Sequence, residues 1–129
     1  MFALTSQYCY YLYRQPTDMR KSFTGLSGLV YTQLRRPPTS GEVFLFVNKR
    51  RDMIKLLRFE GNGFILYYKR LESGTFELPE FADQATSCVM SWAGLVMMIE
   101  GLSMKRVYQR KRFSIFDRNE QNRAGAVNK

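Results

Sequence analysis

The stretch from residue 42 to residue 79 constrains the fold of this chain more than any other part. It holds runs of β-branched, aromatic and aliphatic residues at 43–47, 53–59, 64–68 and, more weakly, 76–78. Turn-forming residues separate the runs, and Gly61-Asn62-Gly63 is the strongest turn signal, because glycine and asparagine accept the positive φ of a tight hairpin turn. Short connections between consecutive strands give antiparallel pairing. We therefore expect an antiparallel meander on which the rest of the chain folds.

Residues 8–13 predict a further strand with large side chains on both faces, and so a central or doubly covered place in the sheet. A helix then follows, with Thr17 or Asp18 as its N-cap and its end near Leu34. Its buried stripe is predicted from the helical spacing of Met19, Phe23, Leu26, Val30 and Leu34. Gly25 and Gly28 lie near that stripe, which suggests a close approach of this helix to the sheet.

After the meander, residues 80–87 are polar and predict irregular structure. Ser91 is a good N-cap for a second helix that Gly101 closes. The predicted buried stripe of this helix comprises Trp92, Leu95, Val96 and Ile99. Together these elements predict an α+β fold, in which residues 1–104 form a single domain and residues 105–129 a basic, partly disordered C-terminal tail.

Charge gives the clearest indication of a partner. The 129 residues include 20 Lys and Arg against 11 Asp and Glu, a net charge of +9, and from Lys105 onward there are 8 basic and 2 acidic residues. A balance of this kind favours polyanionic partners, chiefly nucleic acid.

Composition also excludes several kinds of site. The chain has no histidine, which excludes histidine-activated nucleophiles and histidine-ligated zinc. Its two cysteines, Cys9 and Cys88, are far apart in sequence and in apolar surroundings, so we expect buried free thiols and a reducing compartment. No apolar run approaches the roughly 20 residues of a membrane span, and no secretory signal is evident at the start. We expect a cytoplasmic protein without a cofactor, a metal or a membrane partner.

Carboxylates for metal-dependent phosphoryl chemistry would have to come from Asp18, Asp52, Glu60 and Glu72. Asp18 is better explained as a helix cap, Asp52 as a hairpin residue, and the two glutamates as residues flanking turns. We therefore do not expect an enzyme.

Four groups of residues are candidates for contact with nucleic acid. The first is the face of the second hairpin, where a turn at Asn62-Gly63 places Arg58 opposite Tyr67 and Leu56 opposite Lys69; a turn at Gly61-Asn62 would change these pairs. An aromatic ring beside flexible cations suits stacking on bases or contact with phosphates, although the same residues also suit a solvated outer face. The candidate residues of this face are Arg58, Tyr67 and Lys69.

The other three groups are runs of cations. One is the predicted hairpin tip of Lys49, Arg50 and Arg51, where charge also serves to keep a tip solvated. Another is Arg20 and Lys21, which the prediction places at the positive end of the first helix, where an anion would be favoured. The last is the densest, and a basic arm of this kind often folds on polyanions: its residues are Lys105, Arg106, Arg110, Lys111 and Arg112.

Over residues 4–112, the order and spacing of several segments resemble the TnpB-type, second-reading-frame accessory protein of the family-66 bacterial insertion sequences. The matching segments are YLYRQPTDMRKSFTGL at 11–26, GEVFLFVN at 41–48, IKLL at 54–57, GF at 63–64, YKRLE at 68–72 and SWAGLVMMIEG at 91–101. The resemblance implies an accessory factor encoded beside a separate, larger DDE transposase and needed for efficient transposition. It implies no catalytic residues.

From the charge and the resemblance together, we expect a non-catalytic accessory protein that holds DNA or the transposase–DNA complex electrostatically. Two alternatives stay open at this point. One is a protein-interaction module that docks the transposase without touching DNA, and the other is an RNA-binding regulator of the insertion sequence.

Overall fold

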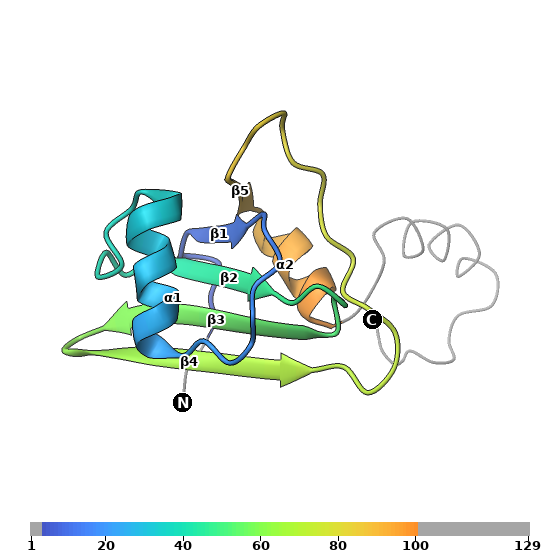
Figure 1. Ribbon diagram of the computed structural model, residues 1–129, viewed down its shortest axis with the longest axis horizontal. Coiled ribbons are helices and arrows are strands. Elements are labelled where there is room, and N and C mark those ends of the chain that lie inside the picture. The colour runs from blue at the N-terminus through green and yellow to red at the C-terminus, as the bar shows by residue number, and fades with distance from the viewer. Residues whose placement is uncertain (1–3, 101–129) are drawn as a thin grey trace.

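The computed structural model describes residues 4–100, and the structural statements below concern that part of the chain. A five-stranded sheet in the order β4-β3-β2-β1-β5 carries one helical segment on each face (Figure 1). The elements are β1 (Tyr10–Tyr13), α1 (Phe23–Leu29), the π-helical η1 (Val30–Leu34), β2 (Val43–Val47), β3 (Met53–Glu60), β4 (Gly63–Arg70), β5 (Ser87–Met90) and α2 (Trp92–Ile99). This is the α+β fold expected from the sequence.

Alternate residues of the central strands supply two hydrophobic cores. Val43, Leu45 and Val47 of β2 face α2, whereas Phe44 and Phe46 face α1. Successive strand residues point to opposite faces, so a run in which all five residues are buried marks a strand covered on both sides. The cores explain why β2 lies in the middle of the sheet.

The three strong runs of the meander form β2, β3 and β4 as predicted, and of the two hairpin turns left open by the sequence, the one at Gly61-Asn62 is observed and the one at Asn62-Gly63 was wrong. Glu60 pairs with Gly63, so the turn is Gly61-Asn62, and Gly61 supplies the positive φ of 64°. Positive φ at the first central residue alone is the pattern of a type II′ turn, whereas the expected Asn-Gly turn needs it at both. As a result Arg58 lies opposite Ile65, Tyr67 opposite Leu56, and Lys69 opposite Ile54.

The outer part of the sheet differs from a simple antiparallel meander. β1 pairs parallel with β2 and antiparallel with β5, so the sheet is mixed. The four-residue strand β5 was not predicted, because its sequence has no strong strand signal, and only its last residue, Met90, is buried. The weak run at 76–78 forms no strand, although Phe76 is completely buried in the core beneath α2.

The first helix begins later than predicted. Ser22 is its N-cap, so the expected caps Thr17 and Asp18 were wrong, and residues 15–21 are an irregular segment before the helix. Thr17 instead donates its backbone N–H to the carbonyl of Val47 at 2.9 Å. This bond ties the segment to the end of β2.

The predicted stripe of this helix is only partly buried. Leu26, Val30 and Leu34 are buried as expected, but Phe23 is 44% exposed. The predicted close approach at Gly28 was wrong, because a Cβ there would meet no atom within 4 Å, and at Gly25 it would meet the stem of Lys21 rather than the sheet.

The second helix is capped as predicted, with the Ser91 hydroxyl accepting the N–H of Gly94 at 3.0 Å. Its buried residues are Leu95, Met98 and Ile99, whereas Trp92 and Val96 are more than one-third exposed, which corrects the expected stripe. The predicted closing residue, Gly101, lies outside the described residues.

Two further expectations concern the cysteines and the membrane. Cys9 is exposed, so the expected burial was wrong there, and Cys88 is half-buried; both are free thiols. None of the helices described between residues 4 and 100 has the length and apolar character needed to span a bilayer.

Candidate nucleic-acid interface

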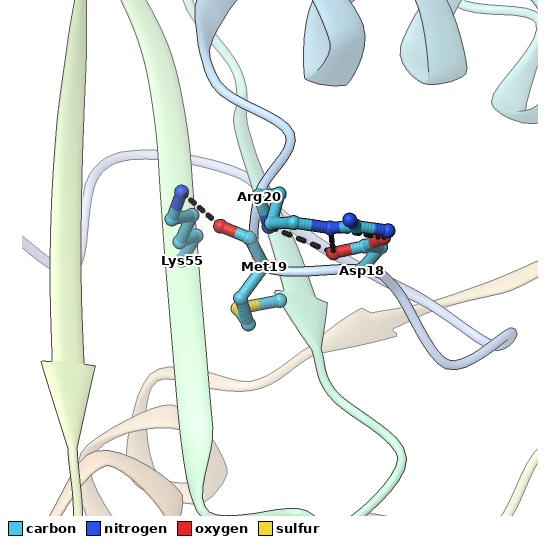
Figure 2. A network of polar contacts seen from close by, with 4 residues as sticks. All are labelled: Asp18, Met19, Arg20 and Lys55. Carbon is cyan, nitrogen blue, oxygen red and sulfur yellow. Dashed lines mark hydrogen bonds and ion pairs between the residues drawn. The ribbon is translucent and has the colours of Figure 1, made fainter.

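A buried lysine in the middle of β3 organises the segment that precedes α1. The Lys55 residue is 5% exposed, and its Nζ donates to the carbonyl oxygens of Met19 and Lys21, both at 2.8 Å. Figure 2 shows the bond to Met19. The ammonium also lies 4.6 Å from the centroid of the Tyr68 ring, so each side of the group has a partner that favours positive charge.

Sequence reasoning missed this role, because Lys55 was interpreted as part of an apolar strand. Its position carried a signal all the same, since it alternates with Leu57 on the face of β3 that packs against α1. A charged residue on a predicted core-facing position needs a partner in the fold.

Residues 17–20 are thereby held in a fixed conformation beside the end of β2. Asp18 accepts the backbone N–H of Arg20 at 2.9 Å and three contacts from its guanidinium, the shortest at 2.6 Å (Figure 2). These hydrogen bonds hold the pKa of the Asp18 carboxyl down at about 2. The guanidinium itself projects into solvent, with the Arg20 side chain 91% exposed.

The hairpin between β2 and β3 is braced from within. Asn48 Oδ1 accepts the N–H groups of Asp52 and Met53 at 3.0 Å, and its Nδ2 donates to Asp52 Oδ1 at 2.7 Å. An Asn side chain often stabilises a turn in this way, by hydrogen bonding to nearby backbone N–H groups. Arg51 takes the left-handed conformation, with φ of 62°.

The segment that follows β4 braces the same hairpin from outside. Phe76 donates its N–H to the carbonyl of Arg51 at 2.6 Å, and Leu71 donates its N–H to the carbonyl of Asp52 at 2.8 Å. Because Phe76 is fully buried, the hairpin is anchored to the core. We call residues 48–52 the braced tip; it presents the exposed residues Lys49, Arg50 and Arg51.

The braced tip and the segment before α1 form the two sides of one shallow, open depression of about 460 Å³. Its lining residues are Pro16, Thr17, Asp18, Met19, Asn48, Lys49, Arg50 and Met53. Of the predicted cations, Lys49 and Arg50 line the depression, and the segment that carries Arg20 and Lys21 forms its other side. Arg20, Lys21 and Arg51 adjoin these segments without lining the depression.

The cations of the braced tip have no carboxylate partner among the described residues. Within residues 4–100, the ion pairs join Arg20 to Asp18, Arg36 to Glu42, Arg58 to Glu60 and Arg70 to Glu72. Lys49, Arg50 and Arg51 take part in none of these pairs. Their charge is available to an outside anion.

Arg58, Tyr67 and Lys69, which were predicted to form a nucleic-acid-binding face, lie in different surroundings from the braced tip. The three residues do lie on one face, but it is the face that packs against α2, because they share strand parity with Leu56. Arg58 donates to the carbonyl of Gly41 at 2.9 Å and lies 4.0 Å from the Tyr8 ring centroid. Lys69 Nζ donates to the carbonyl of Ile99 at 2.8 Å.

These contacts hold the N-terminal segment and the end of α2 in place. Tyr67 packs against the same core. The trio therefore serves internal packing, and its predicted contact with nucleic acid stays a prediction. The last predicted group, Lys105, Arg106, Arg110, Lys111 and Arg112, lies outside the described residues.

Acidic residues do not converge in the described part of the chain. Between residues 4 and 100, no group of three or more His, Cys, Asp or Glu side chains is arranged to hold a metal ion. Asp52 is engaged by Asn48 and Glu60 by Arg58.

Comparison with known proteins places the chain in a family. Residues 8–109 match the family model described as IS66 Orf2 like protein. Among curated proteins, y4jC of Sinorhizobium fredii, an uncharacterized protein, is 38% identical over 93 residues, which cover 72% of this chain and 78% of the relative. A second uncharacterized protein of that organism, y4hO, is 29% identical over 89 residues, or 69% of this chain and 76% of the relative.

No solved structure matches the chain. The family match covers most of its length and agrees with the resemblance carried by the motifs. The chain belongs to the IS66 Orf2-like family, a family of insertion-sequence accessory proteins.

Proposed function

We propose that this protein supports the transposition of its insertion sequence by binding DNA electrostatically, while a separate transposase carries out the chemistry. The observation that carries the proposal is the braced tip, which presents three exposed cations without carboxylate partners. Lys and Arg side chains that neutralise phosphates release bound counterions, and this term supplies most of the affinity of non-specific DNA binding.

The net charge of +9 supports the same function at longer range. A positive field concentrates a polyanion near the protein and raises the rate of encounter. The 8 basic residues from Lys105 onward add to that field, whatever contacts they make. Action on bacterial DNA also accords with the expected cytoplasmic location.

The test is fluorescence anisotropy of the full chain with duplex DNA from the end of the insertion sequence, a scrambled duplex, a single strand and a structured transcript. Each is titrated over a range of salt concentrations. Tight binding to duplex that weakens steeply with salt is the expected result. A preference for the end sequence would add specificity, preference for the transcript would favour the RNA alternative, and no binding near physiological salt would refute the proposal.

A second candidate function is docking of the transposase, and the exposed side of α2 favours it. Trp92 is 38% exposed and Val96, four residues further along the helix, 39%. Large exposed apolar side chains that are neighbours on a helix are typical of protein interaction surfaces. This function predicts salt-tolerant binding to purified transposase that Trp92→Ala weakens, with no loss of DNA binding.

A further inference from the structure

We infer that the depression between the braced tip and residues 16–19 is the docking site for the sugar–phosphate backbone of one DNA strand. Lys49 and Arg50 lie on one side, and on the other lies Asp18, whose carboxylate pairs with the exposed guanidinium of Arg20. The inference rests on the proposed function and deepens it, because it says where on the protein the DNA lies.

Both sides of the depression are fixed before any ligand arrives. The tip is held by the Asn48 side chain and by the bond from Phe76 to Arg51, and the opposite side by Lys55 and by the bond from Thr17 to Val47. A solvated hairpin tip needs no such bracing. A site that is already ordered loses less conformational entropy on binding, which favours a ligand-binding role for these cations.

The chemistry of the lining suits a nucleotide backbone. Pro16, Met19 and Met53 are apolar, and Lys49 and Arg50 are cationic. A deoxyribose presents apolar carbon atoms and its flanking phosphates present charge, so one strand offers both kinds of partner in alternation. The depression is open rather than enclosed, which accommodates a chain that runs through it better than a small molecule.

Asp18 gives the inference a distinctive prediction. It is the one carboxylate among the residues lining the depression, and it opposes a phosphate placed there. Asn in its place removes the negative charge but keeps an oxygen that can accept the N–H of Arg20. Asp18→Asn should therefore tighten DNA binding, roughly fivefold for a unit charge about 4 Å away in water.

The experiment uses the full chain and a short duplex of scrambled sequence, with anisotropy measured over a salt series. Arg50→Gln is compared with Arg35→Gln, which removes the same charge from an exposed residue beside Arg36, whose ion-pair partner Glu42 directly precedes β2 at its other end. The expected result is a fall of about 0.9 in the logarithmic salt slope for Arg50→Gln, one phosphate contact, and little change for Arg35→Gln. The Lys49→Gln/Arg50→Gln double variant should lose about twice as much, and Asp18→Asn should bind more tightly.

Three results would overturn the inference. If the wild-type chain binds duplex with a steep slope but Arg50→Gln and Arg35→Gln behave alike, the DNA lies elsewhere and the proposed function stands. If the wild-type chain does not bind duplex, both fail. If a polyglutamate peptide competes as well per charge as the duplex does, and the effects of Arg50→Gln and Asp18→Asn appear equally with the peptide, the depression is a site for an acidic protein segment instead.

Discussion

Replacing Lys55 by methionine tests whether a buried ammonium holds the segment before α1. Methionine keeps an unbranched apolar stem of similar length but removes the donor to the carbonyls of Met19 and Lys21. Within the described residues Lys55 belongs to no ion pair, so its charge is compensated by these carbonyls and by the Tyr68 ring. The substitution therefore isolates the contribution of those contacts.

The size of the effect follows from two opposing terms. A buried acceptor that loses its donor costs about 1–3 kcal/mol, and the lower end applies here because Lys21 is exposed and Met19 only half-buried, so water can replace part of each bond. Two such carbonyls give a loss of about 2 kcal/mol. Methionine also removes the desolvation cost of the ammonium, which is the term that would reverse the sign if the contacts were weak.

The assay is thermal and urea unfolding of the Lys55→Met variant, together with hydrogen exchange of the native state. For a domain of this size, a loss of about 2 kcal/mol lowers the melting temperature by about 8 °C. The amide of Thr17, bonded to Val47, should exchange faster, because the segment is released from the sheet. Lys69→Met is the control, since it removes one bond, to Ile99, on the other face, and should leave Thr17 unchanged.

A Lys55→Met variant as stable as the wild-type chain, with unaltered exchange at Thr17, would refute the reasoning. Lys55 would then be a buried charge that the fold tolerates, and it would not hold the segment before α1 in place.

Other predictions concern single sites. The Asp18 carboxyl should titrate near pH 2 by carboxyl-carbon NMR. Because this folded-state pKa lies below the unfolded value of about 3.9, its contribution to stability is present above pH 4 and is lost as pH falls towards 2. A titration midpoint near pH 4 would show that the ion pair with Arg20 is absent in solution. Gly28→Ala should raise the free energy of unfolding by about 0.5–1 kcal/mol, because the site is open and alanine favours helix, whereas Gly25→Ala must displace the Lys21 stem and should gain less. Phe76→Ala should cost about 3–5 kcal/mol in urea unfolding although the residue lies outside any helix or strand, and a loss below 1 kcal/mol would mean that Phe76 does not anchor the tip.

Local signals in the sequence predicted most of the sheet and one helix cap. The runs of β2, β3 and β4 are apolar and bounded by turn residues, and Ser91 stands where an N-cap should. What failed depended on long-range pairing. β5 is a strand because its backbone pairs with the edge of β1. The register of the hairpin between β3 and β4 depends on which glycine takes the positive φ.

The candidate site was predictable only in part. The cations at 20–21 and 49–51 were identified from sequence as separate groups, but nothing in the sequence placed the segments that carry them side by side. Their proximity arises from Lys55 and from the bond between Thr17 and Val47, which are tertiary contacts. Conversely, Arg58 and Lys69 were interpreted as surface cations. Their side chains lie on the face of the sheet that α2 covers, and the sequence did not show that this face carries a hydrophobic core.

The most direct test of the central claim is an NMR titration of the full chain with a short DNA duplex, following the backbone amides and the arginine side-chain N–H groups. The account predicts that residues 16–20 and 48–53 shift together along one binding curve, while residues 35–42, at the other end of β2, do not. Binding that leaves both segments unshifted would contradict it.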